Sequence, residues 1–355
     1  MTTMNPARAF LYLVVERCRY PVQSLYTVHR IPPWSLFFSS KGGQRPRSEA
    51  AEIKEAPLPS PIVTLYPSAG DLPMNFVLFG RGKDKIMATD YLGRAFLYDD
   101  ALGAVSALPS MKEPEYDPVS VAVGDDVYFL SNPPDAHGRS VQALADLTYW
   151  SRRSELHWRL VPPPPYAKAK DKTADVYDGA VEAYTLVGES QLWVSAGSYG
   201  TYSLDTQKKI CYSMKGHEVS RGEWSKVGDW RLPFQGRASY AREHKRWFGF
   251  SERDQSILCA ADLQQQPPVV SHEWEGFTVP KAHRQAPVRS FLVHLGTGGR
   301  FCIAKFSYDE SGRDTAMLTG VEVAPCVDGE ALCLIKHKTY RYEGLGEEDN
   351  PICLL

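Results

Sequence analysis

One serine in this sequence fits the pattern of a catalytic nucleophile. Ser198 lies in Ala-Gly-Ser-Tyr-Gly, residues 196–200, which matches the small-x-Ser-x-Gly pattern of a nucleophile elbow. Such an elbow needs a strand before the serine and a helix after it, because the hydroxyl must be exposed at a sharp turn. Residues 191–195 are strand-like, but residues 201–205 predict a second strand instead of a helix. We therefore expect a hairpin turn at Ser198 and no nucleophile.

Four aspartates resemble candidate catalytic carboxylates but recur at repeat spacing. They are 47, 59 and 57 residues apart, and each follows an apolar strand and precedes a segment that runs towards Pro: Asp99, Asp146, Asp205 and Asp262. Asp is favoured in turns because its side chain accepts hydrogen bonds from nearby backbone N–H groups. We expect each of these aspartates to begin the turn between the third and fourth strands of a repeat.

The nine histidines are scattered and show neither His-x-x-x-His nor His-Glu-x-x-His spacing, so a metal site has no support. Phosphate loops of the Gly-x-x-x-x-Gly-Lys-Ser/Thr type are missing, and so is Gly-x-Gly-x-x-Gly. The sequence therefore predicts no catalytic residue, no metal ligand and no cofactor, and we expect the protein not to be an enzyme.

The repeat that contains the aspartates predicts the fold. Short strands at a period of this size are typical of a β-propeller, in which each repeat is one four-stranded blade. Three tryptophans occupy similar places in the repeats, where aromatic rings fill the space between neighbouring blades: Trp158, Trp224 and Trp274. We predict an all-β, single β-propeller domain over residues 1–355, with six blades, and five or seven as the alternatives. Residues 39–61 and 166–178 are predicted to be mobile loops.

Composition limits the classes of function. The net charge of −2 argues against general nucleic-acid binding, and no stretch approaches 18 apolar residues, so no membrane span is expected. Residues 1–47 are basic, which admits two interpretations. The first interpretation is a removable organelle-import segment. The second, which we favour, is that residues 10–15 and 24–31 are strands. In that case one of them should pair with a strand from residues 291–342, because a propeller must close its sheet edges.

The seven cysteines are scattered and contain no Cys-x-x-Cys pair. Most lie in apolar runs, which is typical of reduced core residues. We expect an intracellular protein of the cytoplasm or nucleus, with organelle import left open by the basic start.

A proline run is the one candidate docking motif. Pro163, Pro164 and Tyr166 belong to a Pro-Pro-x-Tyr motif, which in a polyproline II conformation docks on aromatic grooves such as those of WW domains. The alternative, which we favour, is a stiff connector after the last strand of the third blade.

The order of several motifs resembles that of a known family. Residues 10–15 (Phe-Leu-Tyr-Leu-Val-Val), 25–31, 86–111 and 117–128 are similar to successive blocks of a plant family expanded in grasses, domain-of-unknown-function family 1668. The similarity extends from about residue 9 to residue 345. It implies a propeller of kelch-like or F-box-associated-like character and offers no catalytic residues. The Gly-Gly pair that follows the second strand of kelch blades has no counterpart here.

We therefore predict a non-enzymatic protein-interaction scaffold whose unknown protein partners bind loops on one propeller face. One alternative is a hydrolase or lyase with a site in the central channel, built from residues distant in sequence. The other is a carbohydrate-binding module that uses Trp34, Trp150 and Trp193 as exposed platforms.

Overall fold

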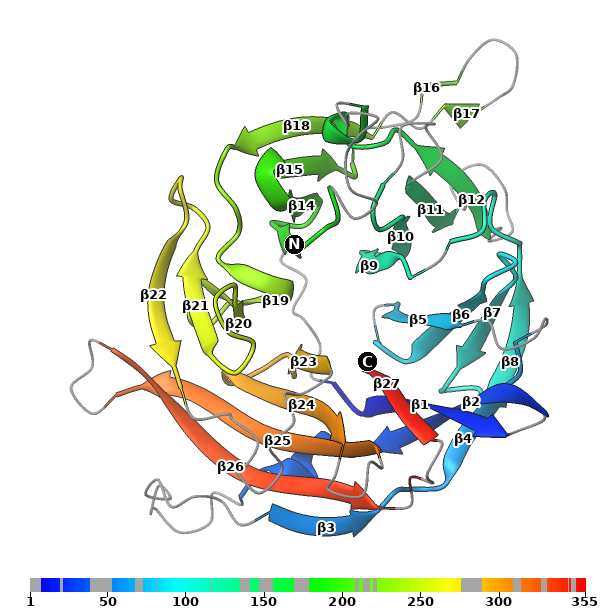
Figure 1. Cartoon of the computed structure of the whole chain (residues 1–355), viewed down its shortest axis with the longest axis vertical. Coiled ribbons are helices and arrows are strands. Elements are labelled where there is room, and N and C mark those ends of the chain that lie inside the picture. The colour runs from blue at the N-terminus through cyan, green and yellow to red at the C-terminus, as the bar shows by residue number, and fades with distance from the viewer. Residues whose placement is uncertain are drawn as a thin grey trace. The chain divides into compact units, whose positions relative to one another are not determined.

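The structure is a computed structural model of the 355-residue chain. It describes residues 8–19, 22–38, 53–67, 73–80, 82–115, 117–134, 141–146, 156–168, 179–207, 211–212, 218–219, 222–275, 289–308, 314–326, 331–343, 345 and 349–355. In these residues the chain is all-β, with strands and three short 3-10 helices (Figure 1). Contacts divide it into two compact units. Unit 1 comprises Met1–Gly70, Ser239–Asp262 and Val270–Leu355, and unit 2 comprises Asp71–Ala238 and Leu263–Val269.

Unit 2 contains four-stranded antiparallel meanders, in which each strand pairs with the next one along the chain. The first meander consists of β5 (Met74–Phe79), β6 (Lys85–Asp90), β7 (Ala95–Asp99) and β8 (Ala104–Leu108). The second consists of β9 (Val119–Val123), β10 (Asp126–Leu130), β11 (Val141–Asp146) and β12 (Leu156–Val161).

The third meander of unit 2 pairs β13 (Ala183–Val187), β14 (Gln191–Ala196), β15 (Gly200–Asp205) and β18 (Glu223–Gly228). A two-stranded hairpin, β16 (Cys211–Tyr212) and β17 (Glu218–Val219), lies between β15 and β18 in the sequence. On its other side β13 pairs in parallel with β19 (Phe234–Ala241).

Unit 1 holds two sheets, and each of them combines strands from the first part of the sequence with strands from the last part. One has the order β27-β1-β2-β4, formed by β27 (Asp349–Leu354), β1 (Leu11–Arg19), β2 (Val22–Ile31) and β4 (Pro61–Leu65). The other has the order β23-β24-β25-β26-β3, formed by β23 (Arg289–His294), β24 (Arg300–Tyr308), β25 (Asp314–Pro325), β26 (Leu332–Glu343) and β3 (Ile53–Pro57). Strands β20 (Arg246–Ser251), β21 (Leu258–Asp262) and β22 (Val269–Trp274) lie side by side in that order.

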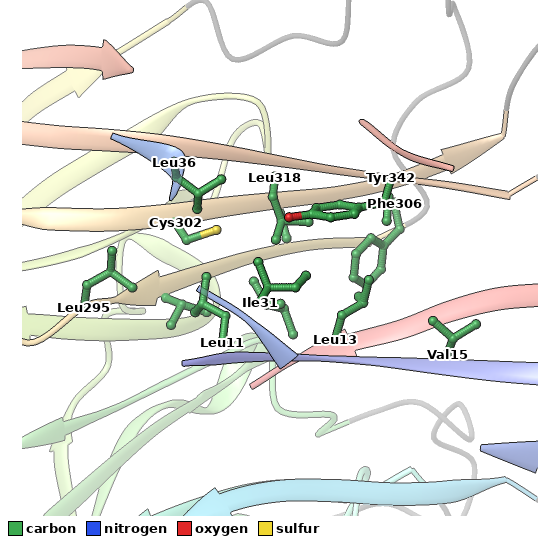
Figure 2. Packing of buried hydrophobic residues seen from close by; sticks show 14 of the residues in the cluster. Leu11, Leu13, Val15, Ile31, Leu36, Leu295, Cys302, Phe306, Leu318 and Tyr342 are labelled. Atoms are coloured by element: carbon green, nitrogen blue, oxygen red, sulfur yellow. The ribbon is translucent and has the colours of Figure 1, made fainter. Parts of the chain in front are cut away.

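The core of unit 1 explains why the first strand forms where it does. β1 is apolar on both faces, and Leu11, Leu13 and Val15 project from one face into a buried cluster. Figure 2 shows Leu13 directed towards Phe306 of the neighbouring sheet, while Leu11 lies on the side of Leu295 and Cys302. Burial of both faces is what a continuous apolar run in a strand predicts. The predicted strand is confirmed over residues 11–15, and Phe10 precedes it.

The prediction named the wrong partner strand for the first strand. β1 pairs antiparallel with β27, from Leu13 opposite Leu354 to Arg17 opposite Asp349, whereas we expected a strand within residues 291–342. The sequence Asp-Asn-Pro-Ile-Cys-Leu contains a proline, which counts against a strand. Pro351 is accommodated because β27 lies at the edge of its sheet, where one side of a strand needs no hydrogen-bond partner.

The predicted mobile loops are wrong in the parts that the structure describes. Residues 39–52 and 169–178 lie outside the described residues. Ile53–Pro57, however, forms β3, which pairs in parallel with β26. Pro165–Lys168 forms a 3-10 helix in which Tyr166 is buried. Both segments are polar or proline-rich in sequence, and tertiary contacts override that local signal.

The cysteine prediction needs one correction. Cys326 and Cys333 form a disulfide across the β25–β26 hairpin, with their Cα atoms 5.1 Å apart. The hairpin brings together two cysteines that are seven residues apart. Cys259 and Cys302 are not part of a disulfide and are buried, as expected of core residues.

Candidate functional site

The outer strand of the first meander, β8, is the most exposed apolar strand edge in unit 2. Its sequence is Ala-Val-Ser-Ala-Leu, and its first four residues are all exposed. Val105 retains 49% of its accessible surface, and Leu102 in the preceding turn retains 77%. Within the described residues no strand pairs with the outer side of β8, so alternate backbone N–H and C=O groups of this strand are directed outwards. An exposed apolar edge of this kind is a template for pairing with another chain.

The register of β8 defines its two faces. Ser106 lies opposite Leu97, and Leu108 opposite Ala95, on the face that packs towards the second meander. Val105 lies opposite Tyr98, on the other face. The turn before β8 is held by Asp99, whose carboxylate accepts a hydrogen bond from the backbone N–H of Leu102 at 3.1 Å.

Three other outer strands carry charge where β8 has none. β12 contains Arg159, β18 contains Glu223 and Lys226, and β22 contains Glu273. Charged side chains on an edge oppose pairing with a second strand. The outer edge of β26 is itself covered, because β3 pairs with it (Figure 1). β8 therefore differs from β12, β18 and β22 in being uncharged and from β26 in having no partner strand among the described residues. It shares both properties with β4, whose sequence is Pro-Ile-Val-Thr-Leu.

The predicted docking motif lies in the core of unit 2. Pro163, Pro164 and Tyr166 are all buried, and Tyr166 retains 1% of its surface. Its ring stacks on Tyr199 at 5.4 Å between centroids and contacts Tyr202 at 5.1 Å. Burial raises the pKa of the Tyr166 hydroxyl above its ordinary value. Docking through this motif stays a prediction, and it would require the segment to leave its packed position.

The four recurrent aspartates have the structural place that the repeat predicts. Asp99, Asp146 and Asp205 are the last residues of the third strands of their meanders, β7, β11 and β15, and Asp262 is the last residue of β21. The Asp205 carboxylate accepts a hydrogen bond from the backbone N–H of Gln207 at 2.9 Å, which caps the turn after β15. Asp99 and Asp205 therefore shape turns.

Ser198 also lies in a turn, as predicted. Residues 197–199 form a single 3-10 turn between β14 and β15, so a strand follows the serine where an elbow would need a helix. Gly200 ends this turn with a φ of +86°, and a Cβ atom there would lie 2.4 Å from the carbonyl oxygen of Gly228. Glycine is required at this position by that close approach.

The recurrent tryptophans make a contact that the sequence did not predict. The indole N–H of Trp158 on β12 donates to the carbonyl oxygen of Pro109, which follows β8, at 2.7 Å. In the next meander, Trp224 on β18 donates to the carbonyl oxygen of Pro162, which follows β12, at 2.8 Å. The same tryptophan–proline hydrogen bond thus links successive meanders of unit 2. Trp158 also packs in the apolar cluster between the first two meanders, which confirms its expected packing role.

An open pocket of about 400 Å³ lies in unit 1 beside β1 and β2. Its wall is the segment 57–61, and Arg17, His29 and Glu343 complete it. Arg17 forms an ion pair with Asp349 of β27, and its Nε donates to the Thr27 hydroxyl at 3.3 Å.

His29 continues this polar network below the pocket. Its Nδ1–H donates to the carbonyl oxygen of Pro59 at 2.6 Å, so its Nε2, 2.9 Å from the Thr27 hydroxyl, is left as an acceptor. Burial lowers the pKa of His29, which keeps the ring neutral, although the Pro59 carbonyl opposes this shift. The network joins both ends of the chain through polar contacts, and its residues show no spacing that sequence reasoning could have recognised.

The other candidate residues do not assemble into a site. Trp34 is exposed, but Trp193 is buried against Trp230 with ring centroids 5.9 Å apart, and Trp150 lies outside the described residues. Across the described ranges, no group of three or more His, Cys, Asp or Glu side chains is placed to hold a metal ion. The helices that the structure describes include none long and apolar enough to cross a membrane.

Repeated four-stranded antiparallel meanders define an all-β protein of the β-propeller class. The predicted count of six blades and the kelch-like character stay predictions. The family model "Protein of unknown function (DUF1668)" matches residues 8–342, and the chain belongs to this family, as its motifs predicted. A crystal structure of the β-propeller domain of Cps50 (Swd1) from Myceliophteria thermophila is similar, with 10% identity and a TM-score of 0.42. The match covers 98% of this chain and 88% of that one. No curated protein matches the chain.

Proposed function

We propose that this protein is a non-enzymatic protein-interaction scaffold, built as a single kelch-like propeller of six blades over residues 1–355. The observation that carries the proposal is the β8 edge, where Leu102, Val105 and their neighbours present apolar surface beside outward-directed backbone groups. Exposed apolar surface on a folded protein is typical of an interaction site. We propose further that the partners are proteins of the cytoplasm or nucleus.

The test is site-specific photo-crosslinking with the full chain. A benzophenone amino acid replaces Leu102 in the turn before β8, and a matched control replaces Leu160, which is an exposed leucine on the charged outer strand β12. In native extract we expect a discrete crosslinked protein from position 102 that is missing from position 160. Equal background at both positions, with the protein folded, would overturn the proposal.

A further inference from the structure

We infer that the Cys326–Cys333 disulfide is a redox-modification site, where a dithiol reduces the folded protein and releases the end of the β25–β26 hairpin from β22. The inference goes beyond the interaction scaffold, because it concerns a covalent change in unit 1 and does not depend on which partner is bound. Cys333 is exposed, whereas Cys326 is half-buried, so a reductant reaches Cys333 first. Exposed disulfides are more readily reduced than buried structural ones, and regulatory disulfides are among them.

The hairpin carries the disulfide on one face and an apolar contact on the other. Cys333 of β26 lies opposite Ala324 of β25, and Cys326 comes two residues after Ala324. Successive side chains of a strand point to opposite faces, so the two cysteines share one face of the hairpin. Leu332 and Leu334 point to the other face, where they pack against a buried cluster that includes residues of β20, β21 and β24. The disulfide is therefore reached from the face opposite to the packed one.

The sheet has enough pairing to stay folded without the disulfide. β25 and β26 are twelve residues long, and they pair from Ala316 opposite Tyr342 to Pro325 opposite Leu332. β24 and β3 flank this pair on its two sides. The disulfide joins residues only seven apart at the end of the hairpin, and a short closed loop constrains the unfolded chain less than a long one. We therefore expect reduction to loosen the hairpin end and to leave the rest of the sheet intact.

The contact that reduction would loosen joins the hairpin end to β22. The backbone N–H of Leu332 donates to Nε2 of His272 at 3.1 Å. The His272 ring stacks on Trp274 with centroids 5.4 Å apart, and Trp274 packs against the same buried cluster as Leu332. Nε2 accepts a hydrogen bond only in the neutral ring, and burial, assisted by Arg246, lowers the pKa of His272 and favours that form. Because Leu332 directly precedes Cys333, a change at the disulfide acts on this contact.

Reduction consists of two thiol–disulfide exchanges. A thiolate of the dithiol attacks Sγ of Cys333, which forms a mixed disulfide and breaks the S–S bond, and Cys326 leaves as a thiolate that takes up a proton. The second thiolate of the reductant then attacks the reductant's own sulfur in the mixed disulfide, and Cys333 leaves as a thiolate that is protonated in turn. Two electrons and two protons pass from the dithiol to the protein, and the reductant becomes a cyclic disulfide.

Thiol trapping with the full chain tests the modification. The oxidised protein is treated with dithiothreitol without denaturant and blocked with N-ethylmaleimide, and the labelled cysteines are identified by mass spectrometry. Cys326 and Cys333 should be labelled about tenfold faster than Cys259 and Cys302, whose burial makes them internal controls. Equal rates at all four positions, or reduction only in denaturant, would overturn the inference. Thiols that persist at positions 326 and 333 after treatment with oxidised glutathione would overturn it as well, because no disulfide would then form.

Hydrogen exchange tests the release from β22. Exchange of the Leu332 amide, resolved by fragmentation in the mass spectrometer, should be about tenfold faster in the reduced protein, because opening of the hairpin end separates this N–H from His272. The double variant Cys326→Ser with Cys333→Ser should exchange like the reduced protein. Unchanged exchange at Leu332 after reduction would overturn the inference.

The variant His272→Ala is the matched control for this contact. It removes the acceptor, so the Leu332 amide should exchange rapidly in both redox states. A difference between the two states as large as in the wild type would show that reduction acts elsewhere, and it would overturn the release from β22.

Discussion

The tryptophan–proline hydrogen bonds of unit 2 allow a quantitative test of what joins its meanders. Trp158 and Trp224 donate to equivalent proline carbonyls at 2.7 and 2.8 Å, so the hydrogen bond is nearly the same in both. They differ in burial. Trp158 is 2% exposed and packs edge-on against Phe129 with ring centroids 5.5 Å apart, whereas Trp224 is only partly buried.

Replacing each tryptophan with phenylalanine removes the donor and keeps an aromatic ring. The loss of one hydrogen bond costs about 1 kcal/mol of the free energy of unfolding. At Trp158 the smaller ring also leaves about 40 Å³ unfilled, which costs about 1 kcal/mol at roughly 24 cal/mol per Å³. Trp158→Phe should therefore cost about 2 kcal/mol. Trp224→Phe should cost about 1 kcal/mol, because water can occupy the space at a partly exposed site.

Urea denaturation followed by circular dichroism measures both variants against the wild type. If the two units unfold separately, the relevant transition is the one that both substitutions move. A shift in the midpoint at constant slope reports a change in stability. A cost for Trp158→Phe no larger than that for Trp224→Phe would refute the reasoning, because burial would then add nothing to the hydrogen bond.

Two further predictions concern a turn and a buried histidine. Gly200→Ala should destabilise by more than about 2 kcal/mol in the same assay, because the Cβ atom meets the Gly228 carbonyl. Gly236→Ala, with a φ of +68° and open space, should cost only about 1 kcal/mol, and equal costs would contradict the clash. Because burial holds the pKa of His29 below 6.5, the unfolded chain binds the proton first on acidification. Stability is therefore full above pH 6.5 and falls below it by at most about 1.4 kcal/mol per pH unit. His29→Asn should flatten this slope, and an unchanged slope would contradict the assignment.

The repeat made part of this structure predictable. Asp99, Asp205 and Trp158 recur at matching places, and a residue that recurs once per blade reports the geometry common to all blades. That is why the end of the third strand and the position of the aromatic ring could be read from spacing alone. The hydrogen bond from Trp158 to Pro109 could not, because its two partners are 49 residues apart and nothing local requires them to meet.

Segments that depart from the repeat were the ones that sequence reasoning missed. β3 and β27 have polar or proline-containing sequences, and each forms a strand because a neighbouring strand, β26 or β1, offers it a partner. Tyr166 shows the reverse case, since a motif that indicates exposure in isolation is packed against two other tyrosines. Local patterns fail where tertiary pairing decides the conformation.

The outer strand of a meander has a special position in this fold, because one of its sides has no partner within the blade. Its side chains therefore decide whether the edge repels or accepts a further strand. The edge of β26 does pair with a further strand, β3, and Arg341 of β26 forms an ion pair with Glu55 opposite it on β3. In β12 and β18, charged side chains oppose addition. β8 has neither a cover nor a charge, and five uncharged residues at an open edge would favour aggregation unless a partner occupies them. The retention of such an edge in a folded chain is therefore the strongest physical argument that it is used for binding.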